Sequence, residues 1–160
     1  MQALLDRCAG LDVHQATVVA TVRVSDDQGK RQVITHTFDT TTASLLALRE
    51  WLQAHGVRQV AMESTGVYWK PVYYVLEEGF EVLLVNMRHL TLVPGRKSDV
   101  RDSEWLAQLL EAGLLRGSLI PPEPIRDLRD LTRYRKKQIQ DRTAEVNRLY
   151  RILEDAGVKL

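Results

Sequence analysis

The stretch CAGLDVHQATVVATVRV, residues 8–24, sets how the fold begins. Its first part is short and mostly apolar and reaches Asp12 near its end, which is typical of a buried strand. From residue 16 to residue 24, apolar residues alternate with threonine and arginine, and this period of two predicts a half-buried strand. Residues 32–38 alternate again after a polar turn at residues 25–30. We therefore expect three strands that pair in antiparallel fashion.

Beyond residue 40 the apolar residues take the spacing of helices and of short buried strands. Leu45, Leu48 and Leu52 share one helical face, and Thr41 or Thr42 can cap its first turn. The elements that follow are a buried strand at residues 59–62 that delivers Glu63, a helix at residues 66–78 with Tyr68, Val72, Tyr73 and Leu76 inward, and a buried strand at residues 81–85. The sequence thus predicts helices that alternate with single strands.

The segment GRKSDVRDSEWLAQLL, residues 95–110, is a basic loop that enters the next helix. Ser98 suits the N-cap position, and Asp99 falls in the first turn, where the helix dipole stabilises a carboxylate. Asp99 and Asp102 are three residues apart and share one helical face, which continues into the leucines of the helix. Carboxylates on the apolar side need a counter-charge, and a divalent metal or a cationic partner would provide it.

The order of these elements is three strands and then helix, strand, helix, strand, helix, which predicts a mixed sheet flanked by helices. The pattern resembles the ribonuclease H-like (RuvC-like) α/β fold. In that fold the first and fourth strands are neighbours, so Asp12 and Glu63 would stand side by side beneath the helix that carries Asp99 and Asp102. Four such carboxylates could not all stay ionised and unpaired, and two Mg²⁺ ions would neutralise them.

A long helix is predicted after the proline-rich segment PPEP at residues 121–124. Its heptad positions a are Ile125, Thr132, Ile139, Val146 and Leu153, and its positions d are Leu128, Arg135, Arg142, Leu149 and Ala156. This repeat is apolar at both ends and polar in the middle. A helix of about 30 residues is on the order of 45 Å long and cannot bury itself on a small domain, so we expect a partner helix.

Composition limits the class of protein. The chain of 160 residues has a net charge of +1, which excludes a strongly basic coat for nucleic acid but allows a local basic patch. Its single cysteine, Cys8, cannot form an internal disulfide and fits a buried thiol in a reducing compartment. No run resembles a signal peptide or a membrane span. We therefore expect a soluble cytoplasmic protein.

Four segments of the chain together resemble a known family. They are GLDVH at residues 10–14, MESTGVYW at residues 62–69, PGRKSDVRD at residues 94–102 and RYRK at residues 133–136. At these spacings they look like the amino-terminal half of the DEDD transposases of the one-hundred-and-ten family of bacterial insertion sequences, which includes the pilin-gene invertase Piv. The resemblance covers essentially all of the chain.

The resemblance implies a RuvC-like DEDD domain over residues 1–120 and a coiled-coil helix for dimerisation and nucleic-acid binding over residues 121–160. It implies Mg²⁺, for which Mn²⁺ can substitute, and catalytic metal ligands at Asp12, Glu63, Asp99 and Asp102. In this family a carboxy-terminal domain supplies a serine nucleophile, and a structured bridge RNA pairs with target and donor DNA. Because the chain ends at Leu160, we expect it to lack that domain and to be inactive alone.

Several other residues have both a functional and an ordinary interpretation. Arg96 and Lys97 are expected to contact phosphate, against simple balance of charge beside the acids. For His14 a turn residue is the ordinary alternative to a role at the site, and for Tyr68 and Trp69 core packing is the alternative to base stacking. A basic cluster on the long helix is expected to bind RNA or DNA, against a solvated face, and consists of Arg133, Arg135, Lys136 and Lys137. Arg135, at a position d, could instead pair with an acid on a partner helix.

Three functions follow from the sequence. The first is the metal-binding domain of an RNA-guided DNA transposase or recombinase that performs phosphoryl transfer with a serine from another domain. The second is a self-contained RuvC-type endonuclease. The third is a non-catalytic coiled-coil module that binds nucleic acid. Binding of divalent metal separates the third from the others, and cleavage of DNA by the isolated chain separates the first two.

Overall fold

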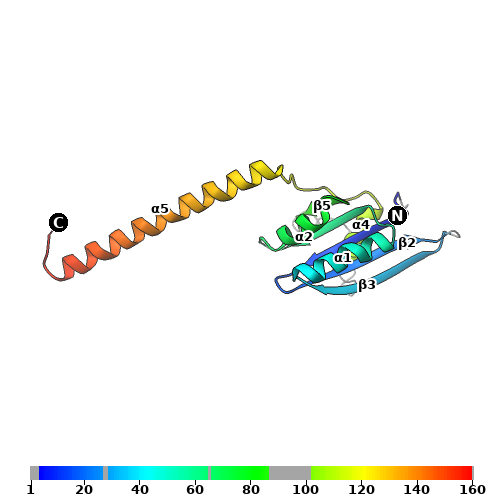
Figure 1. Cartoon of the computed structure of the whole chain (residues 1–160), viewed down its shortest axis with the longest axis horizontal. Coiled ribbons are helices and arrows are strands. Elements are labelled where there is room, and N and C mark those ends of the chain that lie inside the picture. The colour runs from blue at the N-terminus through cyan, green and yellow to red at the C-terminus, as the bar shows by residue number, and fades with distance from the viewer. Residues whose placement is uncertain (1–3, 27–28, 65, 87–101, 160) are drawn as a thin grey trace. The chain divides into compact units, whose positions relative to one another are not determined.

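The computed structural model describes residues 4–26, 29–64, 66–86 and 102–159. The chain divides into two compact units, Met1–Leu119 and Ile120–Leu160. The first unit holds a sheet with helices on both of its faces, and the second holds one long helix (Figure 1).

The first unit is organised by a five-stranded mixed sheet with the order β3-β2-β1-β4-β5. Its strands are β1 (Arg7–Val13), β2 (Thr17–Ser25), β3 (Arg31–Asp39), β4 (Gln59–Ser64) and β5 (Glu81–Val85). The first three strands pair in antiparallel fashion, and β4 and β5 continue the sheet in parallel with β1. The predicted mixed sheet, with three antiparallel strands first and parallel strands after them, is confirmed.

One face of the sheet is covered by α1 (Thr42–Ala54) and α2 (Trp69–Leu76). The side chain of Thr41 caps α1 by accepting a hydrogen bond from the backbone nitrogen of Ser44 at 3.3 Å. The main apolar core lies here and includes the predicted leucines Leu45, Leu48 and Leu52 together with Leu11, Val13, Val60, Met62, Val72 and Leu76. These strand residues alternate along β1 and β4, as the period of two requires.

The other face of the sheet is covered by α4 (Asp102–Glu111), whose apolar residues pack on Cys8, Ala61 and Val85. Gly10 allows this helix to approach the strand closely. A Cβ atom on Gly10 would lie 2.5 Å from the backbone nitrogen of Ala107 and would also overlap the carbonyl oxygen of Ser103. Glycine at this position therefore sets the depth at which α4 sits on β1.

Two predicted elements differ from the structure. The helix expected at residues 66–78 is shorter and spans only Trp69–Leu76, because Gly66 has a φ of +62°, which is left-handed and not helical. Tyr68 precedes α2 and is 37% exposed, so the prediction that it faces inward is wrong. The face of β2 that was predicted to be polar is covered by α4, and Thr21 is fully buried there.

The second unit consists of α5 (Glu123–Asp155), which begins after Pro122 and is followed by Gly157 with a φ of +74°. The predicted long helix is confirmed, and most of its side chains are exposed. Ion pairs along the helix, such as Lys137–Asp141 at 2.8 Å, support it locally. Among the residues that the structure describes, no helix combines the length and the apolar character needed to span a membrane.

Candidate metal site

Asp12 and Glu63 lie side by side near the carboxyl ends of β1 and β4. The two strands pair in parallel, and their register places Asp12 opposite Glu63. Because side chains alternate between the two faces of a strand, both acids are on the face on which Cys8 and Ala61 pack against α4. Glu63 is buried, with 6% exposure, and the side chain of Asp12 is 19% exposed. The fold thus brings together two carboxylates from distant parts of the sequence.

Asp102 joins them from the helix above. It is the first residue of α4, and it lines a pocket of about 360 Å³ together with Asp12, Val19, Thr37 and Ser103. The close contact of α4 with Gly10 holds the start of this helix near Asp12, two residues further along β1. The structure therefore places three of the four predicted ligands at one end of the sheet.

The electrostatic environment of Asp12 disfavours a negative charge. Burial raises the pKa of Asp12 above its ordinary value of 3.8, and the negative charge of Asp102 acts in the same direction. His14 opposes both effects, because its Nε2 lies 3.1 Å from Oδ2 of Asp12. A cation bound between these acids would relieve the same penalty, so the site suits a positively charged occupant.

Hydroxyl groups fix the start of α4 on the sheet. Oγ of Ser103 lies 2.9 Å from Oγ1 of Thr21, which lies 2.9 Å from Oγ1 of Thr35. Ser103 and Thr21 are fully buried. The sequence prediction missed these residues, although Ser103 is three and seven residues from Leu106 and Leu110 and so lies on the helical face that packs on the sheet. A polar residue on such a face needs a hydrogen-bonding partner, so the position of Ser103 in the sequence could have predicted a buried hydrogen bond to the sheet.

Other predicted ligands and contacts are not placed by the structure. Asp99, Arg96 and Lys97 lie outside the described residues, as does Ser98. Within the described ranges, no group of three histidine, cysteine, aspartate or glutamate side chains is already arranged to hold a metal ion. The acids that are described still offer what Mg²⁺ and Mn²⁺ prefer, since both ions take carboxylate oxygens as ligands.

The basic cluster of α5 is exposed along the helix. Lys137 pairs with Asp141 at 2.8 Å, and Arg133 lies 4.0 Å from Asp130. Arg135 and Lys136 are exposed as well. These residues belong to the second unit, whereas the three acids belong to the first.

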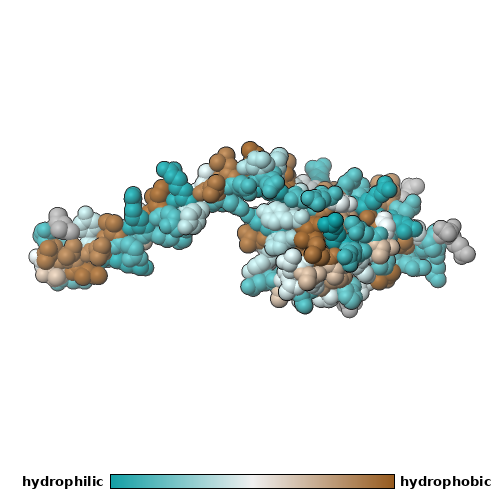
Figure 2. All heavy atoms as spheres, in the orientation of Figure 1, coloured by the Kyte–Doolittle hydropathy of each residue, from teal (hydrophilic) through white to brown (hydrophobic). Residues whose placement is uncertain are grey.

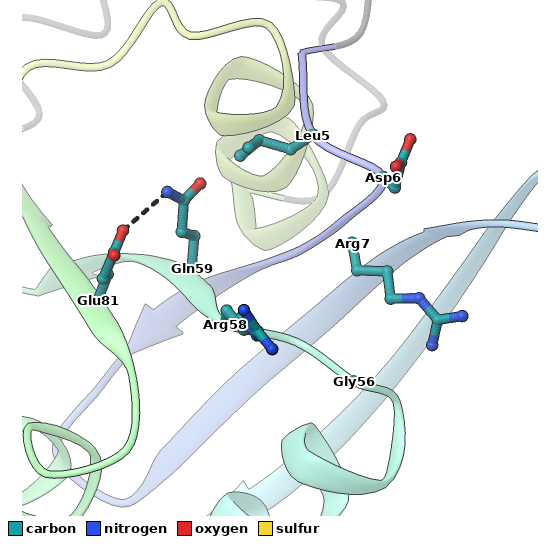
Figure 3. Close-up of a pocket in the computed structure, with 7 residues that line it drawn as sticks. All are labelled: Leu5, Asp6, Arg7, Gly56, Arg58, Gln59 and Glu81. Carbon is teal, nitrogen blue, oxygen red and sulfur yellow. Dashed lines mark hydrogen bonds between the residues drawn. The ribbon is translucent and has the colours of Figure 1, made fainter.

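A second pocket lies at the opposite end of the sheet, where β1, β4 and β5 begin (Figure 3). It has a volume of about 590 Å³ and is lined by Leu5, Asp6, Arg7, Gly56, Arg58, Gln59 and Glu81. Three of its polar side chains already form hydrogen bonds within the fold. Gln59 donates to Glu81 at 2.8 Å, and Arg7 donates to the carbonyl oxygen of His55 at 3.2 Å. Its acids and arginines balance in charge, and the pocket adds nothing to the carboxylate site.

Comparisons with known proteins agree with this architecture. Thermus thermophilus RuvC is similar over 70% of this chain and 99% of that chain, with 14% sequence identity and a TM-score of 0.51. The same protein in complex with a Holliday junction substrate is similar over 71% of this chain and 100% of that chain, with 13% identity and a TM-score of 0.51. Likeness at this identity shows the fold, and the predicted RuvC-like fold is thereby confirmed.

The sequence itself places the chain in a family. None of the curated proteins compared with the chain matches it. The sequence model of the DEDD_Tnp_IS110 family, which is described as "Transposase", matches residues 9–157. This match includes most of the strand with Asp12, the strand with Glu63, the start of α4 and all of α5. The chain therefore belongs to the DEDD transposase family of IS110 insertion sequences.

Proposed function

We propose that this chain is the metal-binding part of a DNA transposase or recombinase, which cleaves and exchanges DNA strands under the guidance of an RNA. The observation that carries the proposal is the register of β1 and β4, which places Asp12 opposite Glu63 in a chain of this family. The start of α4 brings Asp102 to the same pocket as Asp12. Carboxylates grouped in this way support phosphoryl transfer assisted by metal ions.

The ligands that we assign to the metal are Asp12, Glu63, Asp99 and Asp102, and the metal is Mg²⁺, with Mn²⁺ as a substitute. These residues fit a divalent metal ion because their carboxylate oxygens are hard ligands and because the environment of Asp12 disfavours an uncompensated negative charge. When bound, the metal supplies positive charge that stabilises a scissile phosphate and activates the attacking oxygen. Arg96 and Lys97, which precede Asp99 and Asp102 in the sequence, contact the phosphates of the nucleic acid in this proposal.

The rest of the reaction depends on groups outside this site. We assign the nucleophile to a serine of a second domain and the choice of target to a bridge RNA that pairs with DNA. In this scheme residues 1–120 form the catalytic domain, and residues 121–160 dimerise through α5 and bind nucleic acid through Arg133, Arg135, Lys136 and Lys137. On this assignment the chain alone binds metal and forms a dimer but does not complete recombination.

Metal binding tests the core of the proposal. We expect Mn²⁺ to bind the wild-type chain in a calorimetric titration, and we expect Asp12→Asn and Asp102→Asn to weaken or abolish binding. Asp39→Asn is the matched control, because Asp39 is an exposed acid at the end of β3 outside the pocket. Absence of binding by the wild type, or equal binding by all four proteins, would support the non-catalytic nucleic-acid-binding module instead.

A self-contained endonuclease is the second candidate, and one comparison favours it. The chain covers 99% of Thermus thermophilus RuvC, whose structure has also been solved in complex with a Holliday junction substrate. Incubation of the purified chain with branched and linear DNA and Mg²⁺ distinguishes the two candidates. Cleavage that Asp102→Asn abolishes would establish the endonuclease and overturn the dependence on a serine from another domain. Absence of cleavage, together with binding of Mn²⁺, is the result expected for the transposase subunit.

A further inference from the structure

An apolar stripe with two arginines in it runs along α5. The heptad is counted with Ile125 at position a and Leu128 at position d. The apolar residues of the stripe that are between 42% and 60% exposed are Ile125, Leu128, Ile139, Val146 and Leu149. Figure 2 shows apolar side chains gathered mainly toward the two ends of the helix, with hydrophilic ones between them. The hydrophilic part of the stripe includes Arg135 and Arg142, which occupy positions d. A stripe of this kind is stabilised by a second helix packed along it.

We infer that the second helix is α5 of another copy of this chain, that it runs antiparallel, and that Ile139 of each copy faces Arg142 of the other at the centre. The inference rests on the dimerisation included in the proposed function and specifies its geometry. Three features of α5 support this inference. They are the residues at positions a and d, which form the seam between the helices, the residues at positions e and g, which flank the seam, and the length of the helix.

The seam favours the antiparallel arrangement because of its arginines. In a parallel pair, positions d face positions d, so Arg135 and Arg142 would each face their own copies. Sliding one parallel helix along the other by one heptad would not separate the arginines, because it would place Arg135 of one copy against Arg142 of the other. In an antiparallel pair, positions a face positions d, so Arg142 faces Ile139 and Arg135 faces Val146. An arginine can pack its alkyl stem on such a residue while its charged end reaches water, whereas two facing guanidinium groups repel.

The flanks of the seam favour the same register. Antiparallel helices bring position g against position g and position e against position e. In the register centred on Ile139 and Arg142, this places Leu131 near Ile152 and Arg129 near Tyr150. Leu131 is 66% exposed and Ile152 is 63% exposed, although both lie outside the a and d positions. A parallel pair would instead place Leu131 beside Lys136 and Ile152 beside Gly157, so only the antiparallel pair covers one apolar residue with the other.

The length of the helix fits this register as well. α5 spans 33 residues, and the proposed axis lies within two residues of its midpoint. The two helices therefore overlap along almost their full length, which maximises the apolar area removed from water. In this arrangement the two chains lead into the paired helices from opposite ends, roughly 50 Å apart. In a parallel pair, both chains would lead in from the same end.

Spin labels at three equivalent positions test the orientation in the full chain. Asp130, Ala144 and Arg151 all occupy position f, on the outside of the pair, and each is replaced by cysteine in turn and labelled with a nitroxide. Native Cys8 is fully buried and burial raises its pKa to about 11, so it does not compete for the label. The wild-type chain treated with the same reagent is the control for selective labelling, and circular dichroism confirms that each variant keeps its helix.

The antiparallel register predicts a particular pattern of distances between the labels of the two copies. Asp130→Cys and Arg151→Cys give equal distances, with an axial separation of roughly 30 Å, and Ala144→Cys gives a shorter distance with an axial separation of roughly 10 Å. The same distance at all three positions would overturn the inference in favour of a parallel pair. Unequal distances at positions 130 and 151 would overturn the register, and no dipolar signal would overturn the pairing itself.

The outcome is independent of the metal site. The carboxylates lie in the first unit and α5 forms the second. The same three variants are titrated with Mn²⁺, and each should retain the wild-type affinity. A parallel pair with intact Mn²⁺ binding would refute the antiparallel inference and leave the proposed function in place. An antiparallel pair in a chain that does not bind Mn²⁺ would support the inference and refute the metal site.

Discussion

Asp12 is a carboxylate in a place that disfavours its charge. Burial raises its pKa above the ordinary 3.8, the charge of Asp102 adds to this effect, and His14 offsets part of it. Because the pKa is higher in the folded chain than in the unfolded chain, folding carries a penalty above the folded pKa. That penalty declines as the pH falls through the folded pKa and is gone below 3.8. In a site that binds a cation, this loss of folding free energy is present only while the cation is absent.

Removal of this charge should stabilise the metal-free chain. In the presence of EDTA at pH 7, Asp12→Asn should raise the melting temperature by a few degrees, at about 2–4 °C for each kcal/mol, and the gain should shrink as the pH is lowered toward 4. Differential scanning calorimetry measures both effects. The exposed Asp39→Asn variant should change the melting temperature little. A lower melting temperature for Asp12→Asn at pH 7 would mean that the carboxylate is a net stabilising group.

Gly10 matters because it has no side chain. A Cβ atom there would overlap the backbone of α4, so Gly10→Ala should push the helix away from β1 and cost about 1–3 kcal/mol in the free energy of unfolding. Gly79→Ala is the matched control, since its Cβ atom would lie 3.8 Å from Nε2 of Gln53, an ordinary contact. Urea denaturation gives both values. Equal stability of the two variants would show that α4 can move without cost.

At the scale of elements, α4 is fastened to the sheet at both of its ends. Ser103 is bonded to Thr21 at the start, and Glu111 at the end pairs with Arg23 at 2.9 Å and also with Arg31. The first attachment lies beside Asp102, so it affects the position of a proposed metal ligand. The second is a buried ion cluster that joins α4 to β2 and β3.

The hydrogen bond between Ser103 and Thr21 should matter more for metal binding than for the free energy of unfolding. Ser103→Ala should cost about 1 kcal/mol in stability and weaken Mn²⁺ binding several-fold, because Asp102 is no longer held over Asp12. The double variant Ser103→Ala/Thr21→Val removes both buried hydroxyls, and Thr35, which loses its bond to Thr21, is only half-buried and can bond to water. This variant should therefore recover part of the stability but not the Mn²⁺ affinity. Calorimetric titration and urea denaturation of both variants separate the effects. Recovery of the affinity along with the stability would make this pair purely structural.

The buried ion cluster should be worth more than an exposed pair of the same kind. Glu111→Gln leaves two largely buried guanidinium groups without a counter-charge and should cost about 3–5 kcal/mol. Glu154→Gln removes the exposed partner of Lys159 and should cost under about 1 kcal/mol. Urea denaturation of the two variants at low salt makes the comparison. Equal losses would show that the burial of Glu111 does not strengthen its ion pairs.

Much of the sheet could be predicted from alternation, because strands with one buried face repeat every two residues. The covering of β2 by α4 could not, since the helix lies about 80 residues further along the chain and alternation shows nothing of it. Alternation alone therefore predicts a polar face for Thr21 and Arg23. The approach of Asp12 to Glu63 is expected only from the resemblance to a known fold, because local spacing contains no information on which strands pair. The short start of α2 depends on the left-handed Gly66.

At the scale of the whole molecule, the proposed function gives the two units different tasks. The first unit contains Asp12, Glu63 and Asp102, and the second contains the stripe of α5. Each unit has its own means of stability, a two-faced core in the first and a partner helix, as inferred above, in the second. Changes in one unit should therefore leave the property of the other intact.

A single substitution in α5 should test this separation. Ile139 lies at the centre of the proposed pair and faces Arg142 of the other copy, so Ile139→Lys would set two cations against two arginines and should raise the dimer dissociation constant by at least about 100-fold. Sedimentation equilibrium measures this shift, and Mn²⁺ affinity by calorimetry should remain that of the wild type. Gln140→Lys adds the same charge at an outward position b and should leave the dimer intact. A dimer that survives Ile139→Lys would mean that the two copies associate elsewhere, and a loss of Mn²⁺ binding on dissociation would mean that the second copy completes the metal site.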